Sequence, residues 1–384
     1  MKNRINIYLS VFNLFLVSLG VGLVIPVMPL LRESMNLSGA TMGMMVSMFA
    51  LSQLIVSPIA GFSSDKIGEK KIIIIGMLLF SISELIFGLS QSTNGFYFSR
   101  ILGGVAAAFV FPAVTSYVAK ITDDEERPKT MGIVSAAISG GFIVGPGLGG
   151  FLATLGIRTP FFVASVLGLV GFLLSFLYLK EVVLDTKKLK EKQSMKTVLT
   201  DTNYFIPFVI ITISAFGLQA FESIYGVMTA INFNFDTSTI AFVITISGIV
   251  SIVFQLLLFD RLINILGEVI LIRLSFFSSA IFIGILALTK NNVLVMISTL
   301  IIFLSFNLIR PAITTYLSRN AGNNQGAVNG LNSTFTSLGN IIGPMVAGFL
   351  FDLNHFYPYY ISAVTLLLTG FLTFYWQKKV LAKN

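Results

Sequence analysis

The sequence contains no cysteine, which excludes disulfide bonds, thiol chemistry and metal sites built on cysteine. Its only histidine, His355, stands near the end of an apolar run, and we expect it in an exposed loop; a transition-metal site is therefore not predicted. Charge is scarce as well: 11% of the residues are charged, against about a quarter in an ordinary soluble domain. This shortage of charge indicates a membrane protein before any motif is considered.

Long apolar runs fill most of the chain. Of its 384 residues 55% are hydrophobic, and the mean hydropathy is +0.89. An α-helix crosses a bilayer with roughly 20 apolar residues, so the length allows about a dozen crossings, whereas a β-barrel would show short alternating strands. We predict an all-α polytopic membrane protein with twelve transmembrane helices, at residues 7–31, 39–62, 72–92, 95–119, 130–154, 159–179, 204–231, 237–258, 269–289, 292–318, 326–351 and 357–377.

The basic residues predict the orientation of these helices. If the termini and the even-numbered loops lie on one side, that side carries nineteen Lys and Arg residues, and the other carries only Arg32, Arg158 and Lys290. Cytoplasmic loops hold the excess of positive charge in membrane proteins, so both termini are predicted to be cytoplasmic. The net charge of +8 is then a topology signal, and we expect a lipid bilayer, not nucleic acid, as a partner.

The longest polar stretch divides the chain into two halves. It includes KEVVLDTKKLKEKQ, which begins at residue 180 and falls between the sixth and seventh predicted spans. We expect a six-helix bundle over 1–180, a solvated cytoplasmic linker over 181–203 and a second six-helix bundle over 204–384. Because such a twelve-helix unit can form a complete cavity, we expect a monomer.

The two halves repeat one another at an offset of about 195–199 residues. PAVTSY at 112–117 recurs as PAITTY at 311–316, and GFIVGPGLGGFL at 141–152 recurs as GNIIGPMVAGFL at 339–350. Asp65, after the second span, recurs as Asp260. Parallel six-helix repeats are a common construction of transporters that alternate around a central site. The pattern therefore favours a carrier with two pseudo-equivalent halves.

One charged motif joins the second and third predicted spans. In GFSSDKIGEKK at 61–71, Gly61 and Gly68 permit a close helix approach and a tight turn. Asp65, in a cluster that includes Lys70, can accept charge-assisted hydrogen bonds from a helix N-terminus or an arginine. We expect this cluster to latch the cytoplasmic side in one conformation.

A second motif lies within the fifth predicted span. In GFIVGPGLGG, the glycines, among them Gly141, Gly145 and Gly149, permit tight packing of neighbouring helices. Pro146 removes one backbone hydrogen bond and bends the helix. We expect this helix to act as a pivot and a seal at the interface between the two halves.

Four motifs together resemble one family. GFSSDKIGEKK and SRILGG at 99–104 resemble signatures of the major facilitator superfamily. GFIVGPGLGG and LGVGLVIPVMP at 19–29 resemble signatures of its twelve-span drug:proton antiporters. The resemblance covers essentially the whole chain and is strongest to quinolone and multidrug efflux pumps of Gram-positive bacteria. It implies a major facilitator fold in the bacterial cytoplasmic membrane, with no cofactor and with the proton gradient as energy source; the sequence has no G-x-x-x-x-G-K-[ST] loop for ATP.

Charged residues within predicted spans are costly and usually functional. Burial disfavours the charged form of a carboxyl group, so Glu222, in the middle of FGLQAFESIYG, is a candidate proton carrier. We interpret Glu84 as a packing residue and expect Arg273 to extend towards the cytoplasmic surface. The remaining candidates are Arg100 and Arg310.

The resemblance assigns proton coupling to Glu222, Arg100, Arg310 and position 307. In the resembling pumps position 307 is normally an aspartate, the second acid of the coupling pair, but this chain has Asn307, which cannot titrate. Either coupling rests on Glu222 alone, with fewer protons per cycle, or the amide is a substitution that mimics the protonated acid. For Arg100, a purely structural ion pair is the alternative.

The drug pocket is also assigned by resemblance. Aromatic and flexible apolar side chains adapt to ligands of different shapes and attract organic cations. The residues expected to contact substrate are Val21, Ile25, Phe49, Gln53, Phe111, Phe142, Gln219, Glu222, Phe303, Asn307, Thr336 and Asn340.

These observations predict a proton-coupled multidrug efflux antiporter that exports lipophilic and cationic drugs and dyes, such as fluoroquinolones and ethidium-like dyes, by alternating access. A narrow-specificity metabolite exporter of the same fold is one alternative. A coupling-impaired variant or transport-dead receptor is another, because of Asn307. An intramembrane enzyme is disfavoured, since no cluster of His, Cys or acidic residues supplies its chemistry.

Overall fold

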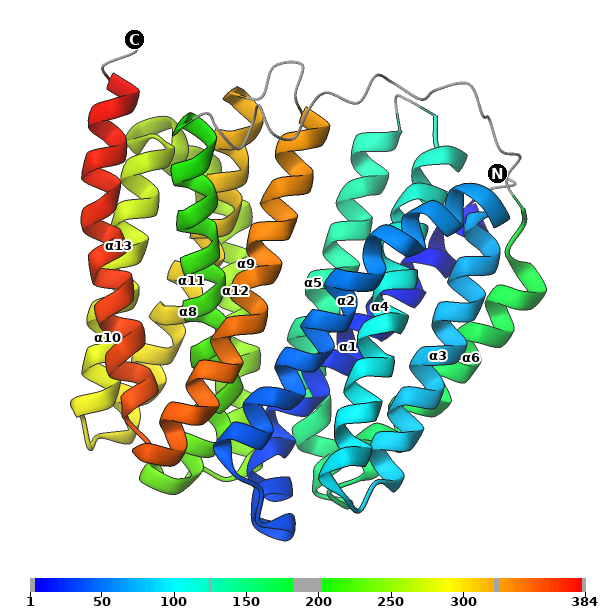
Figure 1. Ribbon diagram of the computed structural model, residues 1–384, viewed down its shortest axis with the longest axis horizontal. Coiled ribbons are helices and arrows are strands. Elements are labelled where there is room, and N and C mark those ends of the chain that lie inside the picture. Colours follow the sequence, from blue (N-terminus) through cyan, green and yellow to red (C-terminus); the bar gives the residue numbers. More distant parts are fainter. Residues whose placement is uncertain (1–3, 124–125, 182–201, 321–324, 382–384) are drawn as a thin grey trace. The chain divides into compact units, whose positions relative to one another are not determined.

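The computed structural model describes residues 4–123, 126–181, 202–320 and 325–381 (Figure 1). Within these ranges it contains twelve helices long and apolar enough to span a membrane, so the chain is an all-α multi-pass membrane protein as predicted. Residues 182–201, most of the predicted linker, lie outside the described ranges. The helices are α1 (Arg4–Met35), α2 (Gly39–Ile67), α3 (Glu69–Leu89), α4 (Thr93–Ile121), α5 (Arg127–Ala153), α6 (Thr159–Tyr178), α8 (Thr202–Phe233), α9 (Thr237–Leu266), α10 (Glu268–Leu288), α11 (Asn292–Asn320), α12 (Gln325–Leu353) and α13 (Tyr357–Leu381).

Two helices run well past their predicted ends. α2 and α9 were expected to end at residues 62 and 258, but they continue to Ile67 and Leu266. A single glycine then separates each from the next helix: Gly68, with φ +92°, and Gly267, with φ +76°. A positive φ favours glycine, so the predicted tight turn at Gly68 is confirmed and has a counterpart in the second half. Asp65 and Asp260 therefore lie within helices, and the side chain of Asp65 lies outside the described part of the structure.

The chain folds into two compact units. Unit 1 comprises Met1–Asn36, Met48–Leu189 and Asp236–Ala241, and unit 2 comprises Leu37–Ser47, Lys190–Phe235 and Phe242–Asn384. In unit 1, α1 packs on α5, and α3 packs on α4 and α6. In unit 2 the pseudo-equivalent pairs recur, with α8 on α12 and with α10 on α11 and α13. The sequence repeat thus corresponds to a repeated packing arrangement.

The glycines of the fifth-span motif hold α5 against α1 within unit 1. A Cβ atom at Gly141, Gly145 or Gly149 would lie 2.6–2.7 Å from a backbone carbonyl oxygen of α1. Because these glycines recur every four residues, they form one continuous helix face. This face therefore lies within unit 1, and the expectation that the helix acts as a pivot and a seal between the halves stays a prediction. Among the described residues, a Cβ atom at Gly61 would meet no atom within 4 Å, so the close approach expected there is not seen.

Candidate functional site

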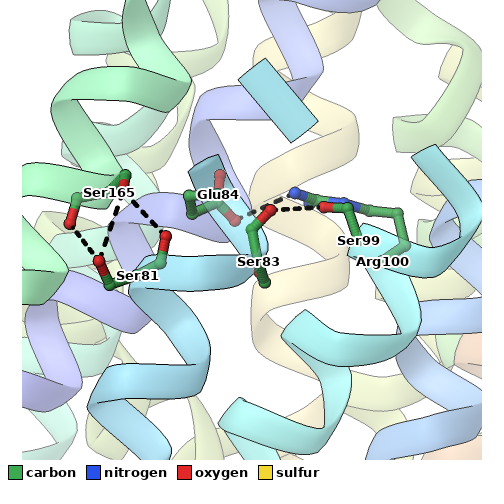
Figure 2. Close-up of polar contacts among 6 residues, drawn as sticks. All are labelled: Ser81, Ser83, Glu84, Ser99, Arg100 and Ser165. Atoms are coloured by element: carbon green, nitrogen blue, oxygen red, sulfur yellow. Dashed lines mark hydrogen bonds and ion pairs between the residues drawn. The ribbon is translucent and has the colours of Figure 1, made fainter. Parts of the chain in front are cut away.

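The core of unit 1 contains a buried ion pair between α3 and α4. Glu84 is 2% exposed and Arg100 is 4% exposed. Arg100 Nη2 donates to Glu84 Oε1 at 3.0 Å, as Figure 2 shows. The guanidinium carbon of Arg100 also lies 4.4 Å from the centroid of the Phe87 ring, a cation–π contact. Glu84, expected to be a packing residue, is thus the ionic partner of Arg100.

Serine hydroxyls join the helices around this pair (Figure 2). Ser99 Oγ of α4 donates to the carbonyl oxygen of Ser83 at 2.8 Å. Ser81 and Ser165 each donate from Oγ to the other's carbonyl oxygen, at 2.8 and 2.9 Å. These hydrogen bonds satisfy buried hydroxyl groups that would otherwise be costly in an apolar core, and they hold α3 against α4 and α6.

Two glycines bring the ion pair close to residues predicted to contact substrate. A Cβ atom at Gly20 of α1 would lie 2.6 Å from the Phe80 ring and 3.9 Å from Glu84 Oε1. A Cβ atom at Gly103 of α4 would lie 3.0 Å from Ser83 Oγ and 3.3 Å from the Phe49 ring. Gly20 is the chain neighbour of Val21. Residues next to two predicted substrate contacts therefore adjoin this region: Gly20, beside Val21 in the chain, lies near Glu84, and Gly103 lies near both Phe49 and Ser83.

The substrate contacts predicted for unit 1 come from four helices. Phe49 and Phe111 are partly buried and pack against the same hydrophobic core. Phe142 of α5 is 43% exposed. Val21 and Ile25 of α1 and Gln53 of α2 are half-buried. Their roles in binding stay predictions.

In unit 2, Glu222 lies in the interior of α8 and is half-buried. Gln219 Nε2 donates to Glu222 Oε2 at 3.3 Å, so the structure brings together two residues that were predicted to share the site. α8 packs on α12 here, because a Cβ atom at Gly343 would lie 3.2 Å from Gln219 Cβ. The Glu222 carboxyl group is therefore hydrogen-bonded to the neutral side-chain amide of Gln219.

An aromatic cluster lies beside Glu222 along α8. The Phe221 ring lies 5.3 Å from Tyr225, 5.9 Å from Phe303 and 5.7 Å from Tyr359, measured between centroids. The Phe303 and Tyr359 contacts are edge-to-face, an arrangement that aromatic pairs prefer. Phe303 was predicted as a substrate contact and is 7% exposed, whereas Phe221 and Tyr359, each 1% exposed, belong to the core of unit 2.

The other predicted residues of unit 2 lie on α11 and α12. Asn307 is half-buried and Arg310 is exposed. Thr336 is buried, and its Oγ1 donates to the Asn332 carbonyl oxygen at 2.7 Å. Asn340 is half-buried. The roles of these residues in coupling and binding stay predictions.

Arg273 is a correction, because it does not extend to water. It is 9% exposed, with Nε donating to Thr373 Oγ1 at 2.9 Å and Nη2 donating to Gln377 Oε1 at 2.6 Å. Its guanidinium carbon lies 3.6 Å from the Phe374 ring centroid. Arg273 therefore ties α10 to α13. His355 does lie in a turn, between α12 and α13, but it stacks on the Phe351 ring at 4.7 Å and is half-buried.

A repeated ion pair was not predicted from the sequence. In unit 1, Glu69 at the start of α3 pairs with Lys120 near the end of α4. In unit 2, Glu268 at the start of α10 pairs with Arg319 near the end of α11. Both pairs join residues 51 positions apart. The two acids could have been matched from the sequence repeat, because Glu69 directly follows Gly68 and Glu268 directly follows Gly267, the glycines of the two tight turns.

Comparisons with known proteins agree with this architecture. The chain matches the Major Facilitator Superfamily over residues 11–230 and 207–384. It is 47% identical to Multidrug resistance protein 2 of Bacillus subtilis (strain 168), covering 99% of this chain and 98% of that protein. It is 45% identical to Multidrug resistance protein 1 of the same strain, covering 98% of this chain and 97% of that protein. It is 40% identical to Quinolone resistance protein NorA of Staphylococcus aureus (strain COL), also covering 98% and 97%.

Solved structures share the fold at much lower sequence identity. The nucleoside transporter NupG superposes with a TM-score of 0.77 at 14% identity, covering 96% of this chain and 98% of that one. A bacterial homologue of the human lysosomal transporter Spinster, inward-facing and occupied, superposes with a TM-score of 0.81 at 14% identity, covering 98% and 97%. At such identities the likeness establishes the fold alone.

Proposed function

Because the chain belongs to the major facilitator superfamily, we propose that it is a proton-coupled antiporter that exports lipophilic and cationic drugs and dyes across the bacterial cytoplasmic membrane. The names of three relatives at 40–47% identity, two multidrug resistance proteins and a quinolone resistance protein, support the substrate class. The positive-inside distribution of Lys and Arg supports cytoplasmic termini. We further propose that the monomer is the working unit and needs no cofactor.

The observation that carries this proposal is the environment of Glu222. A half-buried carboxylate whose partner is the neutral amide of Gln219 is poorly compensated, because burial of charge is costly without an ionic partner. Either a proton or an organic cation would neutralise it. Both cannot do so at once, so occupancy of Glu222 by one releases the other. Mutual exclusion at one carboxylate produces antiport when the carrier changes conformation only with that carboxylate neutralised.

The aromatic cluster beside Glu222 supports the site from within the core of unit 2. Phe221 and Tyr359 are almost fully buried, and Phe221 packs edge-to-face on both Phe303 and Tyr359. These contacts fix the part of α8 that carries Glu222. We propose that Phe49 and Phe111 contact substrate in unit 1, where both are partly buried against the hydrophobic core.

In the proposed cycle Glu222 takes up a proton from outside and releases it inside in exchange for drug. The energy comes from the proton gradient, and Arg100 and Arg310 assist the transfer. Asn307 cannot carry a proton, so we propose that Glu222 is the coupling acid of unit 2. On this account, Glu222 exchanges one proton for one monovalent cation, and export of divalent cations is disfavoured.

Efflux of ethidium from cells that express the chain tests this proposal. Wild type should lower intracellular dye, and an uncoupler should abolish the effect. Glu222→Gln should abolish efflux while leaving the protein in the membrane, and Asn307→Asp should retain it. Uncoupler-resistant efflux would contradict proton coupling. Efflux by Asn307→Asp alone would identify the chain as a coupling-impaired form, and no efflux by any version would favour a narrow-specificity exporter.

A further inference from the structure

Two acidic residues fall within the twelve predicted spans. These are Glu84, within residues 72–92 in unit 1, and Glu222, within residues 204–231 in unit 2; the other acidic residues fall outside the predicted spans. The proposed function uses Glu222 and leaves Glu84 without a role. Intramembrane acids are expensive and usually functional, so Glu84 needs an explanation of its own.

The geometry of the Glu84–Arg100 pair differs from that of a purely structural ion pair. One hydrogen bond joins the two groups, from Nη2 to Oε1. Glu84 Oε2 and Arg100 Nε are both buried and have no hydrogen-bond partner among the residues that the structure describes. A buried ion pair contributes stability only when its geometry is excellent and its remaining polar atoms are satisfied, and arginine–carboxylate pairs are frequently bidentate. A singly bonded pair with two unsatisfied atoms is a costly structural link.

The pair is arranged so that protonation of Glu84 would not leave Arg100 without a partner. The guanidinium keeps its contact with the Phe87 ring, and cation–π attraction strengthens when the cation is desolvated. Phe87 is itself held by Phe96 and Phe161, at centroid distances of 4.7 and 4.2 Å. Arg100 therefore has a fixed second partner when the carboxylate becomes neutral.

Few other charges act on Glu84. Arg100 from α4 is the charged group in contact with it. From α1 and α6, the residues packed against this part of α3 include Gly20, Ser165 and Gly168, which carry no charge. Arg158, before α6, donates to the carbonyl oxygen of Gly88, one turn further along α3. The protonation state of Glu84 is thus set mainly by Arg100 and by burial.

We propose that Glu84 is a second proton-binding residue of the transport cycle, with Arg100 as its switching partner. When Glu84 binds a proton, the carboxylate becomes a neutral acid and the Nη2–Oε1 ion pair is lost, so the core of unit 1 gains one positive charge. Gly20, the chain neighbour of Val21, lies close to Glu84, and Gly103 lies close to both Ser83 and the Phe49 ring. Through these contacts the change is passed towards Val21 and Phe49. This inference rests on the proposed proton-coupled function.

The test measures protons moved per dye molecule by the purified full-length chain in proteoliposomes. Glu84→Gln preserves the shape of the side chain and an acceptor for Arg100 but cannot titrate. We expect it to move one proton fewer per dye than wild type and to lose one step from the pH profile of transport. Ser81→Ala is the matched control, since Ser81 is buried on the same helix and bonds to Ser165 rather than to the pair. It should keep the wild-type ratio.

The outcomes separate this inference from the function on which it rests. If wild type moves dye without protons, the proposed function itself fails. If wild type is coupled and Glu84→Gln keeps the full proton ratio and pH profile, only the inference is overturned, and Glu84 is structural.

A second measurement leaves Glu84 intact and does not depend on the folding of Glu84→Gln. In the Glu222→Gln variant, infrared difference spectra between neutral and acidic pH should show the carbonyl stretch of a protonated, buried carboxyl group. The absence of that band would overturn the inference.

Discussion

Asp352, near the end of α12, caps the N-terminus of α2 within unit 2. Its Oδ1 accepts from the Gly39 amide at 2.6 Å, and its Oδ2 accepts from the Ala40 amide at 2.8 Å. The first amides of a helix lack partners within the helix and carry partial positive charge, so a carboxylate is a favourable cap. Gly43 and Gly348 make the contact possible, since a Cβ atom at either would collide with the backbone of the other helix.

Removal of this cap should destabilise the protein. Asp352→Ala loses both hydrogen bonds, and we expect a loss of about 1 kcal/mol, the usual effect of removing a helix cap. Asp352→Asn keeps acceptor capacity but loses the charge, so it should lose less. Thermal unfolding of the purified protein measures both, with Glu33→Ala, at an exposed site, as a control. Equal unfolding temperatures for wild type and Asp352→Ala would contradict the capping role.

The two repeated ion pairs should differ in strength. The side chain of Glu69 is 1% exposed and also accepts from Ser116, and that of its partner Lys120 is 34% exposed, whereas the side chains of Glu268 and Arg319 are 15% and 61% exposed. Exposed pairs contribute about 0–1 kcal/mol, and a more deeply buried pair costs more to break because the group left behind is less well solvated. We therefore expect Glu69→Ala to lower the unfolding temperature more than Glu268→Ala. Equal effects would show that burial does not set the strength of these pairs.

Asp236, directly before α9, should make the thermal stability of the protein depend on pH. The Thr239 hydroxyl and amide hydrogen-bond to its carboxylate, with the amide at 3.0 Å, and these bonds lower the pKa of Asp236. The pKa of Asp236 is lower in the folded protein than in the unfolded chain, where it is about 3.9. The cap therefore contributes its full stabilisation above the unfolded pKa, and this stabilisation is lost as the pH falls through the folded pKa. The difference in unfolding temperature between wild type and Asp236→Ala should shrink on acidification from neutral pH to about pH 3.

Ser38 provides a matched control for that measurement. It occupies the pseudo-equivalent position before α2, where its Oγ accepts from the Thr41 amide at 3.0 Å. A hydroxyl group does not titrate in this range, so the effect of Ser38→Ala should not depend on pH in this way. If the two variants show the same pH dependence, the carboxylate of Asp236 is not its source.

The sequence alone was sufficient to predict features that depend on local pattern. Twelve apolar runs predicted twelve helices, and glycines spaced four apart in the fifth span predicted its close packing. Features that depend on the relative register of two helices were not predicted. Glu84 and Arg100 were identified singly, but no sequence rule places residues of α3 and α4 at the same depth. The helix ends were also missed at α2 and α9, because a helix can continue beyond its apolar run.

Arg273 and Asp352 illustrate a further limit. The sequence showed a basic residue near the end of a span, for which snorkelling was the simplest expectation. Its actual partners, Thr373 and Gln377, lie on a helix about 100 residues further along the chain. Asp352 caps a helix 313 positions away. Such contacts arise only when tertiary packing brings distant polar groups together in an apolar core.

The central claim is that drug export is driven by protons through Glu222. The most direct measurement is ethidium transport by the purified protein in proteoliposomes under an imposed pH gradient, with and without Glu222→Gln. The account predicts that dye moves against the direction of proton flow, that reversing the gradient reverses dye transport, and that Glu222→Gln abolishes both. Dye transport that does not depend on the pH gradient would contradict proton-driven export. Gradient-dependent dye transport by Glu222→Gln would contradict the role of Glu222.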